Sequence, residues 1–258
     1  MSETTETKVP ERQAWPRPFY KPDAGTPIVR FMIFGAFGKE RPVLDATRHH
    51  VSGPPEGIEA YSVKAEVARR MLEPNFMKER WGDTPAWEHA HKAVNAVQIH
   101  GSPKDDSTLD YLRKTIGLVT AFLEKAGRFP AILDMNSLIL RDAKTWIEDV
   151  HRPQQPGPAA FVQTFSVLGG EKIKLQSRGL LTFGRPDIEI PDVTEEWKDP
   201  AARALSHAIT AQVQGFVIEP GRPVELKGLP PGTVAELHDA TNVPIYPNRF
   251  FRFVSKAA

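Results

Sequence analysis

The 258-residue sequence predicts an α+β fold, in which a mixed or antiparallel sheet is packed by two or three amphipathic helices. Two observations support this prediction. Segments with the β-branched and aromatic composition of strands are interleaved with segments of helical period. The connections between them are uneven in length, and 24 prolines interrupt the chain. Because a doubly wound sheet needs a more regular alternation of strands and helices, we prefer the α+β class.

The composition limits the compartment and the partners. A hydrophobic fraction of 40% is enough for a buried core, and a formal net charge of +1 leaves no excess charge to attract nucleic acid or an anionic membrane. The chain has no Cys, which excludes disulfides and thiolate sites and is typical of a reducing compartment. No apolar stretch approaches the roughly 20 residues that cross a bilayer, and we expect no signal peptide. These features predict a cytoplasmic protein.

The first 27 residues are polar and proline-rich, and their aromatic side chains follow neither a helical nor a strand period. We therefore expect residues 1–27 to be flexible and residues 28–258 to form a single α+β domain. Trp15, Phe19 and Tyr20 are candidate binding residues, because a segment of this kind can wrap a neighbouring subunit and become ordered on contact.

The first half of the domain begins with the β-branched and aromatic run "IVRFMIFGAF", which predicts a strand over 28–37. Prolines and glycines predict an irregular excursion over 38–58. From residue 62 to Pro74 we expect a helix, because apolar residues fall four positions apart. Those apolar residues are Val63, Val67 and Met71. The segment 91–101, "HKAVNAVQIHG", is expected to be a strand that ends in a turn.

The clearest helical signal follows. Ser107 stands three residues before Asp110 as a capping pair, and Gly127 closes the helix. Between them apolar residues recur by three and four, at Leu109, Leu112, Ile116, Val119 and Leu123. The sequence "FPAILDM", 129–135, then predicts a strand.

The second half of the domain again alternates predicted helices with predicted strands. A short helix is expected over 141–149, and "QQPGP" marks a sub-boundary at 153–158. Strands are predicted at 160–170, "AFVQTFSVLGG", and in the C-terminal segments "RPVELKGL" and "RFFRFV". Asp199 and Pro200 begin another helix as N-cap and first-turn proline. We expect its buried residues to be Ala201, Ala204, Leu205, Ala208 and Ile209.

The segment from 178 to 190, "RGLLTFGRPDIEI", carries a resemblance to a known family. Together with the strand, long helix and strand that precede it, this motif resembles an uncharacterised bacterial family that is often encoded near type VI secretion and contact-dependent toxin genes. The resemblance covers roughly residues 90 to 215. It implies a compact α+β domain with a role in binding or immunity, and it implies no catalytic residues. The chain departs from the family at "LDMNS", 133–137, where an aromatic and small residues are expected.

Asp187 and Glu189 alternate with isoleucines in the same motif, so both acids fall on one face of a predicted strand. On one face they lie about 7 Å apart, near enough to share a metal or to flank a scissile bond. We prefer the interpretation that they form the solvated side of a half-buried strand, since the alternation explains every residue. Gly179 and Gly184 are assigned to backbone geometry, because no phosphate-binding glycine pattern precedes a helix.

The sequence "WEHAHK" places His89 and His91 on one face if the segment is extended, with Glu88 beside them. Nitrogen and oxygen ligands for zinc are thus available. The helical spacing of zinc proteases is absent, so we prefer surface histidines and predict neither a metal nor a cofactor.

The C-terminal "PNRFFRF" interleaves Arg249, Phe250 and Arg252 with further phenylalanines. Residues of this composition can stack on nucleic-acid bases or anchor a protein partner. A terminal strand packed against the core explains the phenylalanines more simply, and both interpretations stay open.

These observations lead to three functional hypotheses. The first is a non-enzymatic protein-binding module, such as an immunity or accessory factor of a secreted-toxin system, with a protein partner. The second is a hydrolase-like enzyme that uses Asp187 and Glu189, with or without a metal bound by His89 and His91. The third is a structural subunit of an assembly, which includes a homo-oligomer. The first is preferred, because no assembled catalytic set is evident.

Overall fold

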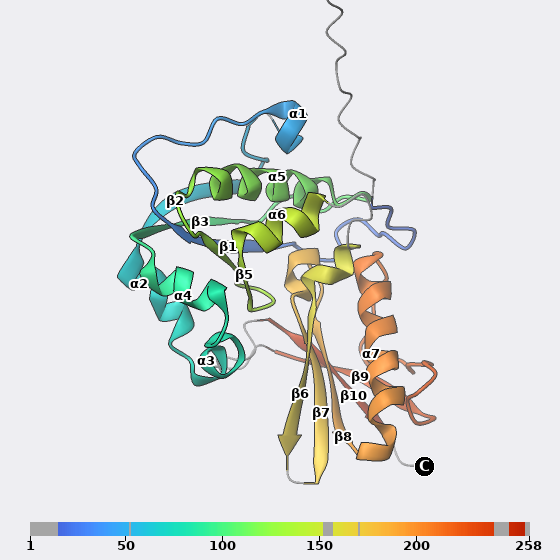
Figure 1. Cartoon of the computed structure of the whole chain (residues 1–258). Coiled ribbons are helices and arrows are strands. Elements are labelled where there is room, and N and C mark those ends of the chain that lie inside the picture. The colour runs from blue at the N-terminus through green and yellow to red at the C-terminus, as the bar shows by residue number, and fades with distance from the viewer. Residues whose placement is uncertain (1–14, 52, 152–156, 170, 240–247, 256–258) are drawn as a thin grey trace, which may run out of the picture.

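The computed structural model describes residues 15–51, 53–151, 157–169, 171–239 and 248–255. In these residues the chain forms two open five-stranded sheets, one antiparallel and one mixed, with helices packed against them (Figure 1). The predicted α+β class is confirmed. Every helix within this part of the chain is too short or too polar to cross a bilayer.

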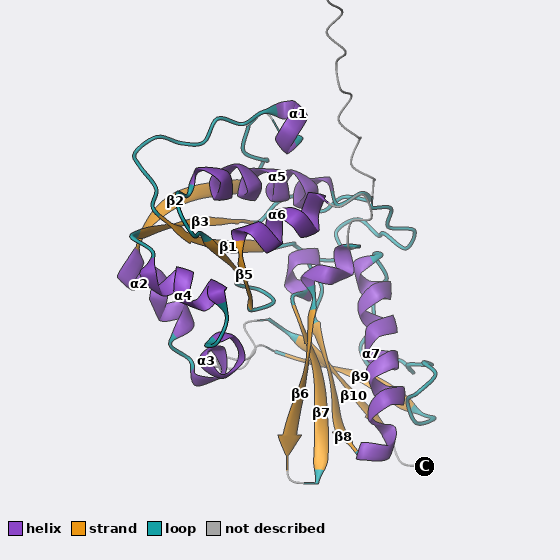
Figure 2. Ribbon diagram, viewed as in Figure 1, coloured by secondary structure: helices purple, strands orange, loops and turns teal. Residues whose placement is uncertain are grey.

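The first sheet has the strand order β2-β3-β1-β4-β5, and each neighbouring pair is antiparallel. Its strands are β1 (Val29–Gly35), β2 (Ile58–Lys64), β3 (Asn95–Gly101), β4 (Ala131–Asp134) and β5 (Ile139–Asp142). Helices lie on both sides of it (Figure 2). One side has α5 (Asp110–Lys125) and α6 (Ala143–His151), with α1 (Ala46–His49) resting on α5. The other has α2 (Ala65–Arg69), the 3₁₀ turn η1 (Arg70–Leu72), α3 (Asn75–Trp81) and α4 (Pro85–Lys92).

The central strand β1 is apolar on both faces because helices cover both. Phe31 and Ile33 belong to the apolar cluster on the α5 side. Met32 and Phe34 belong to a second cluster, together with residues of α2, η1, α3 and α4. Since side chains alternate across a strand, a continuous apolar run is what a strand buried on both faces requires.

The second sheet has the order β6-β7-β8-β10-β9, and only the β8–β10 pair is parallel. Its strands are β6 (Gln163–Gly169), β7 (Lys172–Arg178), β8 (Asp187–Val193), β9 (Thr233–His238) and β10 (Phe250–Ser255). The 3₁₀ turns are η2 (Pro158–Phe161), η3 (Leu180–Phe183) and η4 (Glu195–Trp197). Helix α7 (Lys198–Val213) covers one face, against β7 and β8 (Figure 1).

The α7 face of this sheet is apolar and continues the core of the first sheet. Ile188 and Ile190 of β8 belong to the same apolar cluster as β1 and α5. The five positions predicted to be buried on α7 are confirmed: Ala201, Ala204, Leu205, Ala208 and Ile209. The predicted cap is not, because the helix begins at Lys198 and has no side-chain cap.

The helix predicted over 62–74 is confirmed in part, because helix α2 and the 3₁₀ turn η1 cover residues 65–72. β2 continues to Lys64 because its whole length pairs with β3, so the helix starts only at Ala65 and is short. The predicted buried positions are wrong. Val67 and Met71 are 48% and 42% exposed, whereas the neighbouring residues Ala68 and Leu72 are buried.

The long helix α5 is confirmed, but its predicted cap is wrong. The helix begins at Asp110, and the carboxylate of Asp106, rather than Ser107, accepts hydrogen bonds from the backbone N–H groups of Asp110 and Tyr111. Leu109 has the left-handed backbone angle φ +55°, which turns the chain back so that the carboxylate meets the helix end.

Two predicted strands also change. The strand at 91–101 begins only at Asn95, because residues up to Lys92 belong to α4. "RPVELKGL" forms no strand; Pro223 makes one isolated bridge to Val234. The segment lies along the side of β9 away from β10, where Arg222 and Val224 make backbone hydrogen bonds to Ala235 and Thr233. Because Pro223 has no backbone N–H, this pairing does not continue as a strand.

The predicted flexible segment lies partly outside the described residues, which begin at residue 15. Its described part, 15–27, packs against both halves of the molecule. The backbone N–H of Arg17 donates to Ser107, and that of Phe19 donates to Gln214 after α7. Most of the predicted sub-boundary at 153–158 also lies outside the described residues.

Candidate functional site

The motif "GLLTFG", 179–184, forms the turn η3, where the two sheets meet. The backbone N–H of Ile28, just before β1, donates to Leu181 in the turn. Gly179 has φ +117°, and a Cβ there would lie 2.4 Å from the carbonyl oxygen of Phe161. Gly184 has φ +66°. These glycines serve backbone geometry, as predicted from the sequence.

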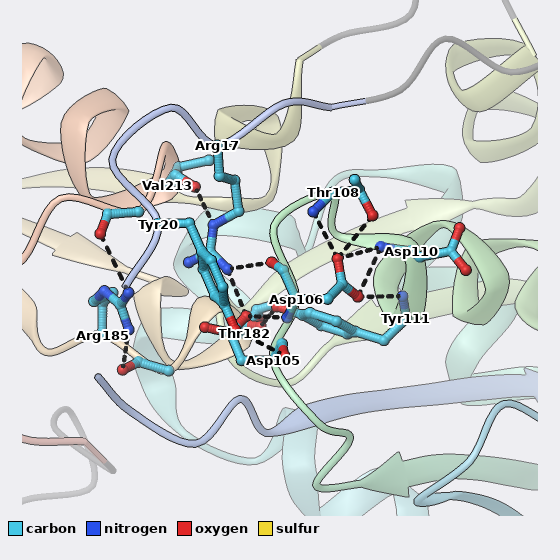
Figure 3. A network of polar contacts seen from close by, with 12 residues as sticks. Arg17, Tyr20, Asp105, Asp106, Thr108, Asp110, Tyr111, Thr182, Arg185 and Val213 are labelled. Atoms are coloured by element: carbon cyan, nitrogen blue, oxygen red, sulfur yellow. Dashed lines mark hydrogen bonds and ion pairs between the residues drawn. The ribbon is translucent and has the colours of Figure 1, made fainter. Parts of the chain in front are cut away.

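Next to η3, segment 15–27, the loop before α5 and the end of α7 form a network that we call the polar junction (Figure 3). Its members are Arg17, Tyr20, Asp105, Asp106, Tyr111, Thr182 and Arg185. Nε of Arg17 donates to the Val213 carbonyl at 3.0 Å, and its Nη1 pairs with the Asp105 carboxylate and donates to the Asp106 carbonyl. The Arg17 and Asp105 side chains are 0% and 6% exposed.

The two tyrosines of the polar junction bind backbone carbonyls. The Tyr111 hydroxyl donates to Thr182 in η3 at 2.9 Å, and the Tyr20 hydroxyl donates to Asp105 at 3.1 Å. The Arg17 guanidinium lies 5.3 Å from the Tyr20 ring centroid. Arg185, which is 2% exposed, donates from Nη1 to the Gly184 carbonyl. The bonds of Arg17 and Tyr20 fasten segment 15–27 to the loop before α5 and to the end of α7.

Burial dominates the electrostatics of the polar junction. It raises the pKa of Asp105, and the nearby Arg17 offsets part of the rise. Burial also acts to raise the pKa of Asp106, but backbone N–H groups, including that of Thr108, outweigh it and hold that pKa below its usual value. Burial, and then repulsion from Arg17, lower the pKa of Arg185. Because these charged groups bind one another and the main chain, the arrangement is that of a structural junction.

Asp187 is buried in β8, at 5% exposure. Its carboxylate accepts hydrogen bonds from the Ser177 hydroxyl at 3.1 Å, the Leu180 backbone N–H at 3.2 Å and the Asn248 amide at 3.3 Å. Burial raises its pKa to about 6, against the lowering effect of these hydrogen bonds. This carboxylate therefore helps to fix the turn η3 to the second sheet.

Glu189, at 1% exposure, is also buried. Its oxygens lie 2.7 Å from Nε of Arg252 on β10 and 3.3 Å from Nζ of Lys174 on β7. The interpretation of Asp187 and Glu189 as the solvated side of a strand is thus wrong. The alternation is real, but neighbouring strands supply donors and cations in place of water.

A further buried carboxyl group ends β4. Asp134, at 4% exposure, accepts hydrogen bonds from the backbone N–H groups of Asn136 and Ser137. Burial raises its pKa to about 6. The Asn136 amide donates to the Thr182 hydroxyl at 2.9 Å, so the "LDMNS" segment is a turn that packs on η3.

The predicted histidine face is wrong, because His89 and His91 lie on helix α4. Residues two apart on a helix point in nearly opposite directions. His91 contacts the Trp87 ring at 4.5 Å, and His89 contacts the Phe129 ring at 5.2 Å. Among the described residues, no group of three His, Cys, Asp or Glu side chains is placed to hold a metal ion.

The C-terminal candidates lie on or beside β10, an inner strand between β8 and β9. Phe250 is 3% exposed and stacks on His238 with ring centroids 5.2 Å apart. Arg252 holds Glu189, whereas Arg249 is exposed. Phe250 and Arg252 therefore serve the sheet, as the simpler interpretation predicts.

The aromatic residues of segment 15–27 differ in exposure. Trp15 is half-buried against the Phe161 ring at 6.3 Å, and Tyr20 belongs to the polar junction. Phe19 is 50% exposed and packs edge-to-face, at 6.2 Å, on Phe216, which is itself 47% exposed. Sequence reasoning missed Phe216; the available signal was the apolar "FVI" directly after Gly215.

Phe216 also lines a cavity of about 320 Å³ between α7 and the segment 216–226. Its apolar wall includes Ile218, Val224 and Leu226, and its rim carries Lys21, Glu219, Arg222 and Glu225. We call Phe19, Phe216 and this cavity the aromatic surface. It combines two exposed rings with a hollow and with charges of both signs.

A search of protein-family models, of curated proteins and of solved structures finds no match to this chain. The family resemblance carried by residues 178–190 therefore stays a prediction.

Proposed function

We propose that this protein is a non-enzymatic protein-binding module and that it binds its partner through the aromatic surface. The observation that carries the proposal is the pair Phe19 and Phe216, half-exposed rings in contact at 6.2 Å beside a cavity of about 320 Å³. Exposed aromatic pairs beside a pocket are typical of the central contacts of protein interfaces.

The chemistry of the surface indicates the kind of partner. The apolar cavity fits one or two apolar side chains. On its rim, Arg222 and Glu219 pair at 3.4 Å, and Lys21 and Glu225 add one charge of each sign. A partner segment with an apolar anchor flanked by charges of both signs complements this surface.

The resemblance carried by "RGLLTFGRPDIEI" extends the proposal to an immunity or accessory factor of a secreted-toxin system. The partner would then be a toxin or a secretion component. The hydrolase hypothesis gains no support from the geometry, because Asp187 and Glu189 are both buried and engaged.

The test is affinity capture of the tagged protein from its own cell lysate with identification by mass spectrometry, followed by titration calorimetry with the purified partner. The variants are Phe19→Ala and Phe216→Ala. The control is Phe129→Ala, because Phe129 is 66% exposed on a different part of the molecule. We expect each test variant to weaken binding at least about tenfold, the scale of an interface hot spot, and the control to bind as the wild type does. Equal affinity in all the variants would exclude this surface.

A further inference from the structure

The two open sheets present four edge strands: β2 and β5 in the first, and β6 and β9 in the second. An exposed edge offers unpaired backbone groups to any extended chain, so proteins usually protect edges with charge, proline, bulges or short length. Three of these edges are protected. β2 carries Glu59 and Lys64, and β5 is four residues long and carries Arg141 and Asp142. The outer side of β9 is covered by backbone hydrogen bonds from segment 221–224.

The edge strand β6, "QTFSVLG", breaks the rule. It is seven residues long, contains no charged residue and no proline, and pairs with β7 along its whole length without a register shift. Val167 is 40% exposed and Leu168 is 79% exposed. Figure 1 shows β6 at the outer side of its sheet, in a hairpin that points away from the first sheet.

The sequence of β6 is self-complementary about its centre. If two copies pair antiparallel with Ser166 opposite Ser166, each Phe165 lies opposite Val167 on one face, and each Thr164 lies opposite Leu168 on the other. Aromatic and β-branched residues are favourable cross-strand pairs. β6 itself contributes no charge to the pairing; the guanidinium of Arg80, on α3, lies 4.6 Å from the Phe165 ring. The hairpin that carries β6 is already ordered on its other side by β7, so pairing requires no new strand to form.

We propose that β6 is a homodimerisation edge, through which a second copy of this chain joins antiparallel about a two-fold axis at Ser166. The pairing merges two five-stranded sheets into one continuous ten-stranded sheet. It also gives the unpaired backbone groups of the β6 edge a partner. This surface is separate from the aromatic surface, so the inference stands or fails independently of the proposed function.

The experiment measures the mass of the full chain by light scattering and sedimentation over a range of concentrations. Ser166→Lys and Ser166→Glu each place two like charges on the axis, which opposes pairing. Ser166 is exposed, so neither substitution disturbs the core of the monomer. Ser62→Lys is the matched control, because Ser62 is exposed near the middle of the seven-residue edge strand β2.

We expect a wild-type dimer, a dimer dissociation constant raised at least about 30-fold in each Ser166 variant, and recovery of the dimer when the two variants are mixed in equal amounts. Ser62→Lys keeps the wild-type dimer. Backbone amides of β6 exchange hydrogen more slowly in the dimer than in the Ser166 variants.

Three results would overturn the inference. The first is a wild-type chain that is still monomeric at about 1 mM, because its dimer dissociation constant would then exceed about 1 mM. The others are a dimer that both charge variants retain and a loss of the dimer that mixing the two variants does not reverse. The variant Phe216→Ala keeps the dimer if the aromatic surface has its own partner. Loss of the dimer in that variant would assign self-association to the aromatic surface instead.

Discussion

The two sheets bury their strands in different ways. In the first sheet, β1 has an apolar cluster on each face, with Phe31 on one and Met32 on the other. In the second sheet, β8 places Ile188 under α7 but turns Glu189 to the opposite face, where that side chain is 1% exposed. A buried strand therefore need not be apolar on both faces, provided that its polar face finds donors and cations.

This difference sets how each sheet responds to substitution. Apolar burial contributes in proportion to area, so the first sheet loses stability gradually as methyl groups are removed. A buried charge depends on its partners, and removing one of them leaves a desolvated ion. The polar face of the second sheet therefore depends on a few contacts, among them that between Arg252 and Glu189 at 2.7 Å.

The largest expected effect is that of Arg252→Met. The substitution removes the guanidinium 2.7 Å from Glu189 and leaves a buried carboxylate behind. We expect the free energy of unfolding to fall by about 2 to 3 kcal/mol, which is less than the cost of an uncompensated buried charge, because the Arg252 side chain is 39% exposed and Lys174 stays near the carboxylate. Chemical denaturation at neutral pH measures it. The matched control is Arg249→Met in the same segment, which is exposed and should change stability by less than about 0.5 kcal/mol. Similar losses in the two variants would contradict this account.

The next effect concerns a buried carboxyl group of the first sheet that is held mainly by backbone N–H groups. Burial raises the pKa of Asp134 to about 6, from an ordinary value of 3.8. The folded state thus binds a proton more tightly than the unfolded chain, so the stabilising contribution is present below about pH 4 and is lost as pH rises through about 6. Asp134→Asn removes this pH-dependent loss of stability, because the amide does not ionise.

We therefore expect the free energy of unfolding of Asp134→Asn, relative to the wild type, to increase by about 2 kcal/mol between about pH 4 and pH 7. Denaturation curves across this range measure the difference. The exposed residue Asp83 provides the control, since Asp83→Asn should follow the wild-type curve. Parallel curves for Asp134→Asn and the wild type would show that the carboxyl group is not protonated in the folded state near pH 5.

The contrast between the sheets also explains what the sequence could predict. The local spacing of apolar residues was enough to predict β1, α5 and the buried face of α7, because each of these patterns continues over several residues or helical turns. It failed at Val67 and Met71, where pairing of β2 with β3 delays the helix. It also failed at Glu189, whose partner Arg252 lies 63 residues away along the chain. Both failures depend on contacts that no local window contains.

The candidate site shows the same limit. Phe19 could be proposed from the sequence because it is an aromatic residue in a polar segment. For Phe216 the sequence offers only the apolar run after Gly215, and its exposure depends on the place where α7 ends and on the packing of Phe19 against it. The polar junction was hidden too, because Arg17, Asp105 and Arg185 come from three distant segments.

A third prediction tests whether the two sheets are fastened together by the polar junction. Arg17→Lys keeps the charge but removes the planar guanidinium group, whose nitrogens donate to Val213 and Asp106 as well as to Asp105. We expect a loss of about 2 kcal/mol and faster hydrogen exchange over segment 15–27. Arg222→Lys is the control, because the Arg222 side chain is 75% exposed. Unchanged exchange in Arg17→Lys would mean that other contacts hold the segment.

The smallest effect separates the two cations around Glu189. Lys174 lies 3.3 Å from this carboxylate, whereas Nε of Arg252 lies 2.7 Å from it, and the two cations are similarly exposed, at 36% and 39% of their side chains. We expect Lys174→Met to cost less than about 1 kcal/mol in the free energy of unfolding, because Arg252 still holds the carboxylate. In the double variant Arg252→Met with Lys174→Met, the loss should exceed the sum of the single losses, because the second cation then becomes the one that matters. A single loss for Lys174→Met as large as that for Arg252→Met would instead make the lysine the principal partner, and the buried charge of the second sheet would depend on β7 rather than on β10.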